Sequence, residues 1–291
     1  MVSNCGNIVL WDIFESKNYN VLSGHKNAVL EVKWSNHDHN EILSCSADKT
    51  VALWDSNRGQ RVKKFAEHNG IVNSCSFARD SGAILASGSD DCTAIVWDKR
   101  NKTSINTFYQ DYPILSVCLS HDGYSLYTGG IDNMIRRYDL RMMGTDTNET
   151  ADLLLSGHSD SITGMSISPD GQHLLSNSMD SSLRVWDIRP FALNTAIANA
   201  NANARQEAVL YGVHHGAEKL MLRCAWSSNQ EYLSCGSADK IVHLYEGNHY
   251  RELCGWPGHK ASVNEVIFHP TENILASCSS DRSIIIGEFD Q

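Results

Sequence analysis

The sequence predicts an all-β fold built from repeated sheets of four short strands. Three residue markers recur along the chain in a fixed phase, roughly every 40 to 60 residues. Between the markers, apolar runs of about six residues alternate with turn-forming residues. No segment shows the apolar period of an amphipathic helix. We therefore expect strands and turns throughout the chain.

The first marker is an aromatic residue followed by an acidic one, and the second is an aspartate six residues earlier. The third is a histidine nine positions before a large apolar residue. The aromatic residues are Trp11, Trp54, Trp97, Tyr138, Trp186 and Tyr245, with Gly287 as a degenerate seventh. The aspartates are Asp48, Asp91, Asp132, Asp180, Asp239 and Asp281, and the histidines are His25, His68, His158 and His259. Three markers in phase indicate one structural unit repeated along the chain.

Each repeat is expected to contain four strands. The first strands are predicted at 29–34, 72–77, 162–167 and 263–268. The second strand ends at the marker aspartate, the third ends at the marker aromatic residue, and the fourth leads to the next histidine. The N-terminal segment supplies only a third strand at 7–11 and a fourth strand at 19–22, and the last repeat stops after its third strand. We therefore expect either that strands upstream of the first sheet have been lost from this sequence or that its first blade is built atypically.

The composition is that of a folded protein and excludes several classes of function. The chain has 291 residues, with 34 acidic and 24 basic side chains and a formal net charge of −10. No apolar run approaches the roughly 20 residues needed to cross a bilayer. The acidic balance disfavours binding that depends on neutralising phosphates, so any contact with nucleic acid is expected to be indirect.

The chemistry-bearing residues predict no catalytic, cofactor or metal site. Nine cysteines are present without any Cys-x-x-Cys spacing, so we interpret them as small thiols on buried strands in a reducing compartment. No phosphate-binding glycine loop and no nucleophile elbow is found. His, Asp and Ser recur together, but a catalytic triad needs one site, whereas this set returns in almost every repeat. An enzyme is therefore disfavoured.

Four short strands per repeat with Gly-His and Trp-Asp signatures resemble the WD-repeat β-propellers. The resemblance covers the whole chain and implies a single propeller over 1–291, with seven blades of which the N-terminal one is incomplete. The partial blade spans 1–22, and the repeats span 23–65, 66–108, 109–155, 156–213, 214–254 and 255–291.

The family resemblance also implies a role for the markers. In WD-repeat propellers the histidine, the turn aspartate, a strand serine or threonine and the tryptophan form a hydrogen-bonded chain within each blade. Here this structural network would comprise His25, Asp48, Trp54, His68, Asp91, Trp97, Asp132, His158, Asp180, Trp186, Asp239, His259 and Asp281. Two repeats depart from the pattern, because Gln110 and Ala217 stand where the histidine is expected. His214 and His215 lie slightly upstream of Ala217.

Longer stretches resemble the family of WD-repeat subunits of the U5 small nuclear ribonucleoprotein. They include 72–75, 129–133, 174–180, 184–192, 236–239, 263–270, 279–282 and 286–288, and in that family too a Gly-Glu pair replaces the last Trp-Asp. The resemblance implies a non-catalytic scaffold in the nucleus that acts in pre-mRNA splicing. It implies the large U5 splicing proteins as partners and contact with U5 RNA only through them. No membrane and no small-molecule substrate is expected.

The alternative is a substrate receptor of a cullin-type ubiquitin ligase. Three Trp/Tyr-Asp-x-Arg matches place arginines at Arg100, Arg141 and Arg189. Propellers that carry substrates to such ligases resemble this pattern, with the arginine directed at the adaptor. The other interpretation is an arginine that pairs with a neighbouring acid.

Partner contacts are predicted where the first strands begin and at the turns that follow the marker aspartates. The residues are Asn27, Lys49, Gly70, Tyr112, Asp160, Lys240 and Ala261. An exposed Tyr112 would be the best anchor, because aromatic residues dominate interface hot spots. An ordinary solvated rim is the alternative for each residue taken singly.

Overall fold

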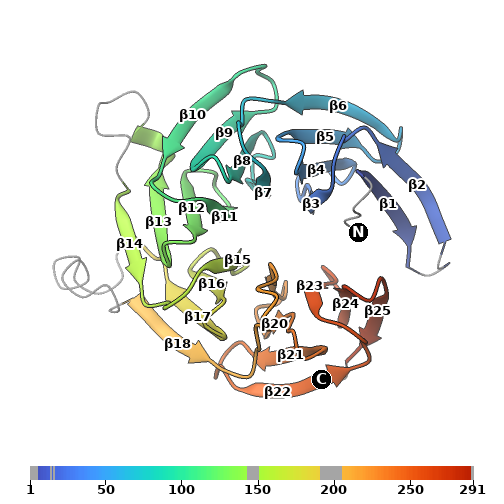
Figure 1. Cartoon of the computed structure of the whole chain (residues 1–291), viewed down its shortest axis with the longest axis vertical. Coiled ribbons are helices and arrows are strands. Elements are labelled where there is room, and N and C mark those ends of the chain that lie inside the picture. Colours follow the sequence, from blue (N-terminus) through green and yellow to red (C-terminus); the bar gives the residue numbers. More distant parts are fainter. Residues whose placement is uncertain (1–5, 14, 16, 143–150, 191–204, 290–291) are drawn as a thin grey trace. The chain divides into compact units, whose positions relative to one another are not determined.

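The computed structural model describes residues 6–13, 15, 17–142, 151–190 and 205–289. The strands are labelled in Figure 1, and the helical element described is the 3₁₀ turn η1 (Leu140–Met142). Two compact units are present, unit 1 (residues 1–130 and 136–153) and unit 2 (residues 131–135 and 154–291). Among the described residues, no helix has the length and apolar character needed to cross a membrane.

Unit 1 begins with a two-stranded antiparallel sheet of β1 (Asn7–Asp12) and β2 (Lys17–Ser23). Four-stranded sheets follow, with their strands hydrogen-bonded in chain order. The first consists of β3 (Val29–Trp34), β4 (Glu41–Ser46), β5 (Val51–Asp55) and β6 (Gln60–Phe65). The next consists of β7 (Val72–Phe77), β8 (Ile84–Ser89), β9 (Thr93–Asp98) and β10 (Ser104–Tyr109). The boundary between the units falls within the sheet of β11 (Ile114–Leu119), β12 (Ser125–Gly130), β13 (Met134–Asp139) and β14 (Leu153–Ser156).

Unit 2 continues the same arrangement. Its first sheet consists of β15 (Ile162–Ile167), β16 (His173–Ser178), β17 (Ser182–Asp187) and β18 (Gln206–Leu210). The second consists of β19 (Cys224–Trp226), β20 (Tyr232–Cys235), β21 (Ile241–Glu246) and β22 (Glu252–Pro257). The last has three strands among the described residues, β23 (Val263–Phe268), β24 (Ile274–Ser279) and β25 (Ile284–Glu288).

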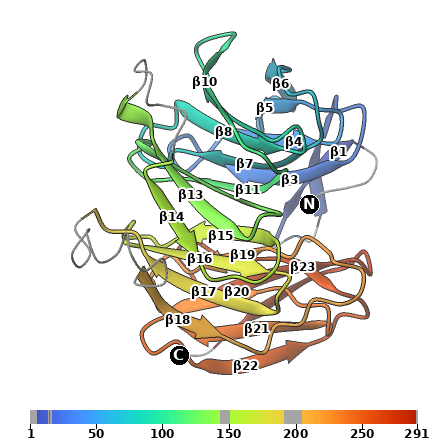
Figure 2. The same ribbon diagram turned by 60° about the vertical axis from the view of Figure 1, so that its left-hand side comes forward.

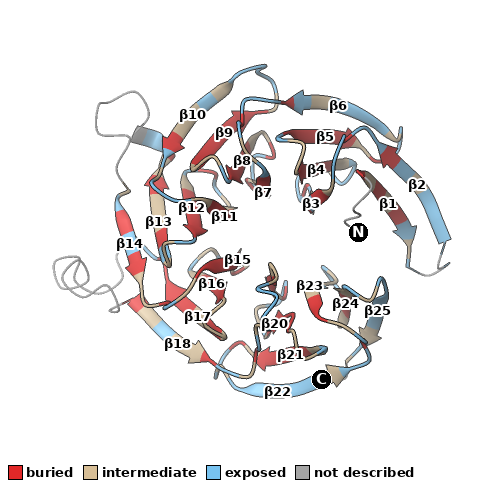
Figure 3. Ribbon diagram, in the orientation of Figure 1, coloured by how far each residue is buried: buried red, intermediate tan, exposed pale blue. Residues whose placement is uncertain are grey.

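The predicted all-β propeller class is confirmed, because the sheets are repeated antiparallel meanders of up to four strands. The predicted first strands have the bounds of β3, β7, β15 and β23. Burial follows strand order within a sheet, as Figure 3 shows: β9 is buried along its whole length, whereas β6 is mostly exposed. The inner strands β8 and β9 are therefore more deeply buried than the outer strand β6, which carries charged side chains.

The turn between the second and third strands has one conformation in six sheets. The residue after each marker aspartate has a positive φ between 62° and 75°, at Lys49, Cys92, Asn133, Ser181, Lys240 and Arg282. The aspartate side chain holds this turn, as where Asp48 Oδ1 accepts the Thr50 N–H at 3.1 Å. The marker aspartate thus has a local function in the backbone before any longer-range contact is considered.

Neighbouring sheets in unit 1 are joined through their first strands. Glu31 Oε2 on β3 accepts the backbone N–H of Cys75 on β7 at 2.9 Å. Ser74 Oγ on β7 accepts the backbone N–H of Val117 on β11 at 3.1 Å. Apolar side chains from the facing sheets, among them Leu43 and Trp97, form one buried cluster between them. Side-chain acceptors and a shared core therefore hold adjacent sheets face to face.

Unit 2 uses the same kind of link with other residues. Thr163 Oγ1 on β15 donates to the carbonyl of Leu222 at 2.9 Å, just before β19. The guanidinium of Arg223 donates back to the Thr163 carbonyl at 2.7 Å. The backbone N–H of Arg223 donates to the Asn264 carbonyl on β23. Figure 2 shows the sheets of unit 2 stacked in this order.

Substitution of Gly130, at the end of β12, tests how closely two backbone segments of unit 1 approach each other. A Cβ there would lie 2.2 Å from the carbonyl oxygen of Pro113. Gly130→Ala is expected to lower the free energy of unfolding by about 1–3 kcal/mol, because a backbone atom must move to make room. Chemical denaturation measures the change. Gly216→Ala is the control, since its Cβ would meet Ala238 at an ordinary 3.4 Å. Equal stability of the two variants would contradict the argument.

Candidate functional site

The network residues meet inside each sheet, beginning with β3–β6. The imidazole of His25 lies just before β3, with Nδ1 3.0 Å from Asp48 Oδ2 and Nε2 2.7 Å from Ser44 Oγ. Trp54 Nε1 donates to the same Ser44 Oγ at 2.8 Å. The bonds therefore join the loop before the first strand, the second strand, the third strand and the turn between them.

The same chain of bonds recurs in other sheets. The histidine Nδ1 lies 3.0, 2.9 and 3.2 Å from the turn aspartate in the pairs His68–Asp91, His158–Asp180 and His259–Asp281. The Nε2 of each ring lies 2.8 Å from Ser87, Ser176 and Ser277, respectively. Trp97 and Trp186 donate at 2.8 Å to the serines of their own sheets. Because the same set of hydrogen bonds is repeated in separate sheets, we interpret it as structural.

In the sheets of His25, His68 and His158, a neutral imidazole completes the chain of hydrogen bonds. Burial lowers the pKa of His25, His68 and His158 below the ordinary value of 6.5, although the aspartates oppose this effect. With its proton on Nδ1, the ring donates to the aspartate and accepts from the serine hydroxyl. That hydroxyl in turn accepts from the tryptophan N–H. The buried serine hydroxyl is therefore fully engaged, and a nucleophilic role would break the chain.

The sheet β11–β14 replaces the histidine and the tryptophan together. Gln110 Nε2 donates to Thr128 Oγ1 at 2.6 Å and to the hydroxyl of Tyr138 at 3.0 Å. Thr128 stands where the other sheets have serine, and Tyr138 packs on Phe108 with ring centroids 4.4 Å apart. A different set of side chains thus satisfies the same buried positions. The predicted Asp132 lies in the turn between β12 and β13.

The sheet β19–β22 departs further from the pattern. His243, on the third strand, takes the place of the missing histidine: its Nε2 lies 2.9 Å from Asp239 and its Nδ1 lies 2.8 Å from Glu252. His215 points instead toward Asn177 of the preceding sheet, at 3.4 Å. The histidine spacing had given no sign of His243, because it lies on another strand.

Gly287 occupies the aromatic position of the last sheet. A Cβ on Gly287 would lie 2.8 Å from the ring of Trp256, which comes from β22 of the neighbouring sheet. Trp256 also packs against Phe289 at 5.9 Å. The glycine therefore accommodates an indole that arrives from outside the sheet, which explains the degenerate marker.

The predicted partner contacts lie at strand starts and turns. Asn27, Lys49, Tyr112 and Lys240 are exposed, whereas Gly70, Asp160 and Ala261 are half-buried. Tyr112 is 53% exposed and is the aromatic residue of the set. Asp160 is held by Lys219 Nζ at 3.4 Å. The role of these residues in binding stays a prediction.

Comparison with known proteins places this geometry in a family. The model of the WD domain, G-beta repeat, matches residues 16–55, 59–98, 102–139, 151–187, 210–246 and 250–286. The chain belongs to the WD-repeat family. It is 44% identical to the U5 small nuclear ribonucleoprotein 40 kDa protein of Dictyostelium discoideum, over 97% of this chain and 76% of that protein. It is 39% identical to the pre-mRNA-splicing factor cwf17 of Schizosaccharomyces pombe, over 97% of this chain and 78% of that protein. The human U5 small nuclear ribonucleoprotein 40 kDa protein is 41% identical over 65% of this chain and 48% of its own length.

The WD repeats are offset from the sheets by one strand. The first matched repeat, 16–55, runs from β2 to β5, and the second, 59–98, runs from β6 to β9. Each repeat therefore joins the fourth strand of one sheet to the first three strands of the next. Six WD repeats are matched, one fewer than the predicted blades, because the two-stranded sheet of the incomplete first blade does not form a repeat of its own: β1 lies before the first repeat and β2 belongs to it. The repeat boundaries that we predicted from the sequence follow the sheets and not the matched repeats, and they stay a prediction.

The three Trp/Tyr-Asp-x-Arg arginines of this WD-repeat protein pair with their own acids. The Nη2 of Arg100, Arg141 and Arg189 lies 2.8, 2.6 and 2.5 Å from the carboxylate two residues earlier. Side-chain hydrogen bonds from Arg100 and Arg141 lower the pKa of Asp98 and Asp139. The arginine side chains remain 74%, 64% and 50% exposed. Local pairing thus accounts for the motif, and adaptor binding stays a prediction.

The network predicts an acid-sensitive WD-repeat fold. The unfolded histidines take up protons near pH 6.5, whereas buried His68 resists protonation, so stability falls as the pH drops below 6.5. Burial raises the pKa of Asp91, but hydrogen bonds from Thr93, the Asn69 N–H and His68 outweigh it and lower the pKa to about 2. A second loss of stability therefore begins below the ordinary aspartate value of 3.8 and continues toward pH 2.

His68→Gln tests the first of these losses. The substitution is expected to cost about 1 kcal/mol at pH 8, because hydrogen bonds are lost, and to reduce the slope of stability between pH 7 and pH 5. Urea denaturation at several pH values measures both effects. An unchanged slope would show that His68 does not titrate in this way.

Proposed function

We propose that this chain is a non-catalytic protein-docking scaffold of the U5 small nuclear ribonucleoprotein that acts in pre-mRNA splicing in the nucleus. The observation that carries the proposal is the likeness to the Dictyostelium U5 40 kDa protein and to fission-yeast cwf17. Both likenesses extend over 97% of this chain. Likeness over the whole repeat array includes the loops that carry function, in addition to the strands that carry the fold.

The hydrogen bonds made by the reactive groups support a non-catalytic role. Each His–Ser–Asp set lies within a sheet, and its serine accepts from a tryptophan in the sheets β3–β6, β7–β10 and β15–β18. His25, His68 and His158 are buried and neutral, which removes them from contact with a substrate. A scaffold tolerates the substitutions seen at Gln110 and His243, whereas a catalytic set repeated along the chain would have no single site to serve.

The partners are proteins, and U5 RNA is reached through them. The chain carries a formal net charge of −10, so direct contact with phosphates is disfavoured by repulsion. The large U5 splicing proteins are the partners proposed. Tyr112, 53% exposed just before β11, is the proposed anchor in unit 1, because a rigid aromatic side chain offers a large contact area.

The proposal is tested by tagged purification from the native cells, with sequencing of the recovered RNA and identification of the recovered proteins. Enrichment of U5 RNA together with the large splicing proteins, resistant to moderate salt, is the expected result. Tyr112→Ala is expected to reduce the recovery of both. Tyr124→Ala is the matched control, since Tyr124 is 51% exposed in the same unit.

One result would contradict the U5 proposal, and another would contradict the role of Tyr112 alone. Recovery of a cullin adaptor without U5 RNA would favour the ligase receptor, especially if Arg189→Ala abolished it. Equal loss of partners in the Tyr112 and Tyr124 variants would remove Tyr112 as the anchor while leaving the U5 assignment to stand on the RNA.

A further inference from the structure

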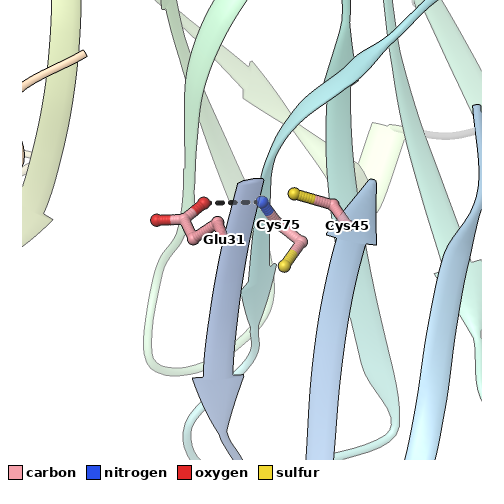
Figure 4. Close-up of side chains that lie close together, drawn as sticks. All are labelled: Glu31, Cys45 and Cys75. Atoms are coloured by element: carbon pink, nitrogen blue, oxygen red, sulfur yellow. Dashed lines mark hydrogen bonds between the residues drawn. The ribbon is translucent and has the colours of Figure 1, made fainter. Parts of the chain in front are cut away.

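Two thiols and a carboxylate meet between the sheets β3–β6 and β7–β10 of unit 1. Cys45 on β4 and Cys75 on β7 are fully buried, and Glu31 on β3 is 3% exposed. Their two Sγ atoms and a carboxylate oxygen all lie within 4.8 Å of one another. Figure 4 shows the Glu31 carboxylate and the Cys45 thiol on either side of Cys75. Three strands of two sheets thus bring metal-ligating atoms to one buried place.

We propose that Glu31, Cys45 and Cys75 form a binding site for a thiophilic divalent cation of the Zn²⁺ class. Zinc takes thiolate sulfur at about 2.3 Å and carboxylate oxygen at about 2.0–2.2 Å. Tetrahedral ligands at those lengths lie about 3.6–3.8 Å apart, so the three atoms must approach one another by up to about 1 Å when the ion binds. Three protein ligands leave one coordination position for water. This inference is independent of the splicing function.

The charges around the site suit a divalent ion. Two thiolates and one carboxylate would carry one negative charge more than the ion neutralises. Lys33 Nζ lies 3.1 Å from Glu31 Oε1 and supplies the balancing positive charge. The other oxygen of Glu31 accepts the Cys75 backbone N–H at 2.9 Å, which fixes the orientation of the carboxylate. Such bonds to a ligating carboxylate are the usual outer support of a metal site.

A second Glu–Cys pair shows that the site requires a further thiol. Glu265 faces Cys278 across β23 and β24, in the register that pairs Glu31 with Cys45 across β3 and β4. Among the described residues, a group of three potential ligands forms at Glu31, Cys45 and Cys75 but not at Glu265 and Cys278. The second thiol, from the neighbouring sheet, makes the difference. Cys278 therefore provides a matched internal control.

Binding would link two sheets that are otherwise held by packing and a few hydrogen bonds. Cys45 and Cys75 belong to different sheets, so an ion held by both would cross-link them. A ligand that binds only the folded state raises its stability by mass action.

The test is a Cd²⁺ titration of the untagged full-length chain, kept reduced and stripped of metal, followed by thiolate-to-Cd²⁺ charge-transfer absorption. We expect saturation at one equivalent and a higher melting temperature with added Zn²⁺. Cys45→Ser and Cys75→Ser should abolish the absorption, whereas Cys278→Ser should retain it. Lys33→Met should weaken binding about tenfold, because it removes an outer partner of the ligating carboxylate.

Two outcomes would overturn the proposal. The first is a wild-type chain that shows no charge-transfer band at one equivalent of Cd²⁺. The second is a band of equal size in the Cys45 and Cys75 variants. Circular dichroism checks that each variant is folded. A wild-type chain that shows no band overturns the proposal even if a serine variant fails to fold.

Discussion

A buried serine hydroxyl on the second strand is the junction on which the repeated sheets of this protein depend. It accepts the indole N–H from the third strand and donates to the histidine that precedes the first strand, and the histidine donates to the turn aspartate. Backbone pairing fixes strands to their neighbours and also holds the end of the loop before the first strand, where the Ala28 carbonyl accepts the Ala47 N–H at 2.9 Å. The hydrogen-bonded side chains hold this loop further upstream, at His25. A missing partner would leave polar atoms buried without bonds, which is costly.

The exceptions follow the same constraint. Where the histidine is absent, Gln110 bonds to Thr128 and to a tyrosine hydroxyl that has replaced the indole. In the sheet β19–β22, where the histidine is also absent, His243 on the third strand contacts the turn aspartate instead. The requirement is therefore that the buried donors and acceptors be satisfied, and several residue sets can do so.

Local regularities made much of the fold predictable, while contacts between repeats were not. The first strands, such as 72–77, follow from their apolar runs and from the marker phase, and they have those bounds in the structure. The role of Trp256 over Gly287 could not be predicted, because the two residues come from different sheets and share no spacing rule. The meeting of Cys45 with Cys75 was hidden for the same reason. No Cys-x-x-Cys motif marks it, and only the stacking of two sheets creates it.

The central claim, that each hydrogen-bonded chain acts as one unit, is tested most directly by a double-mutant cycle on Ser87→Ala and Asp91→Asn. These residues are linked through the two nitrogens of His68. Urea denaturation of the two single variants and the double variant should give a coupling energy of about 0.5 kcal/mol or more. Ser44→Ala with Asp91→Asn, taken from separate networks, should be additive. Additivity in the first pair would contradict the account.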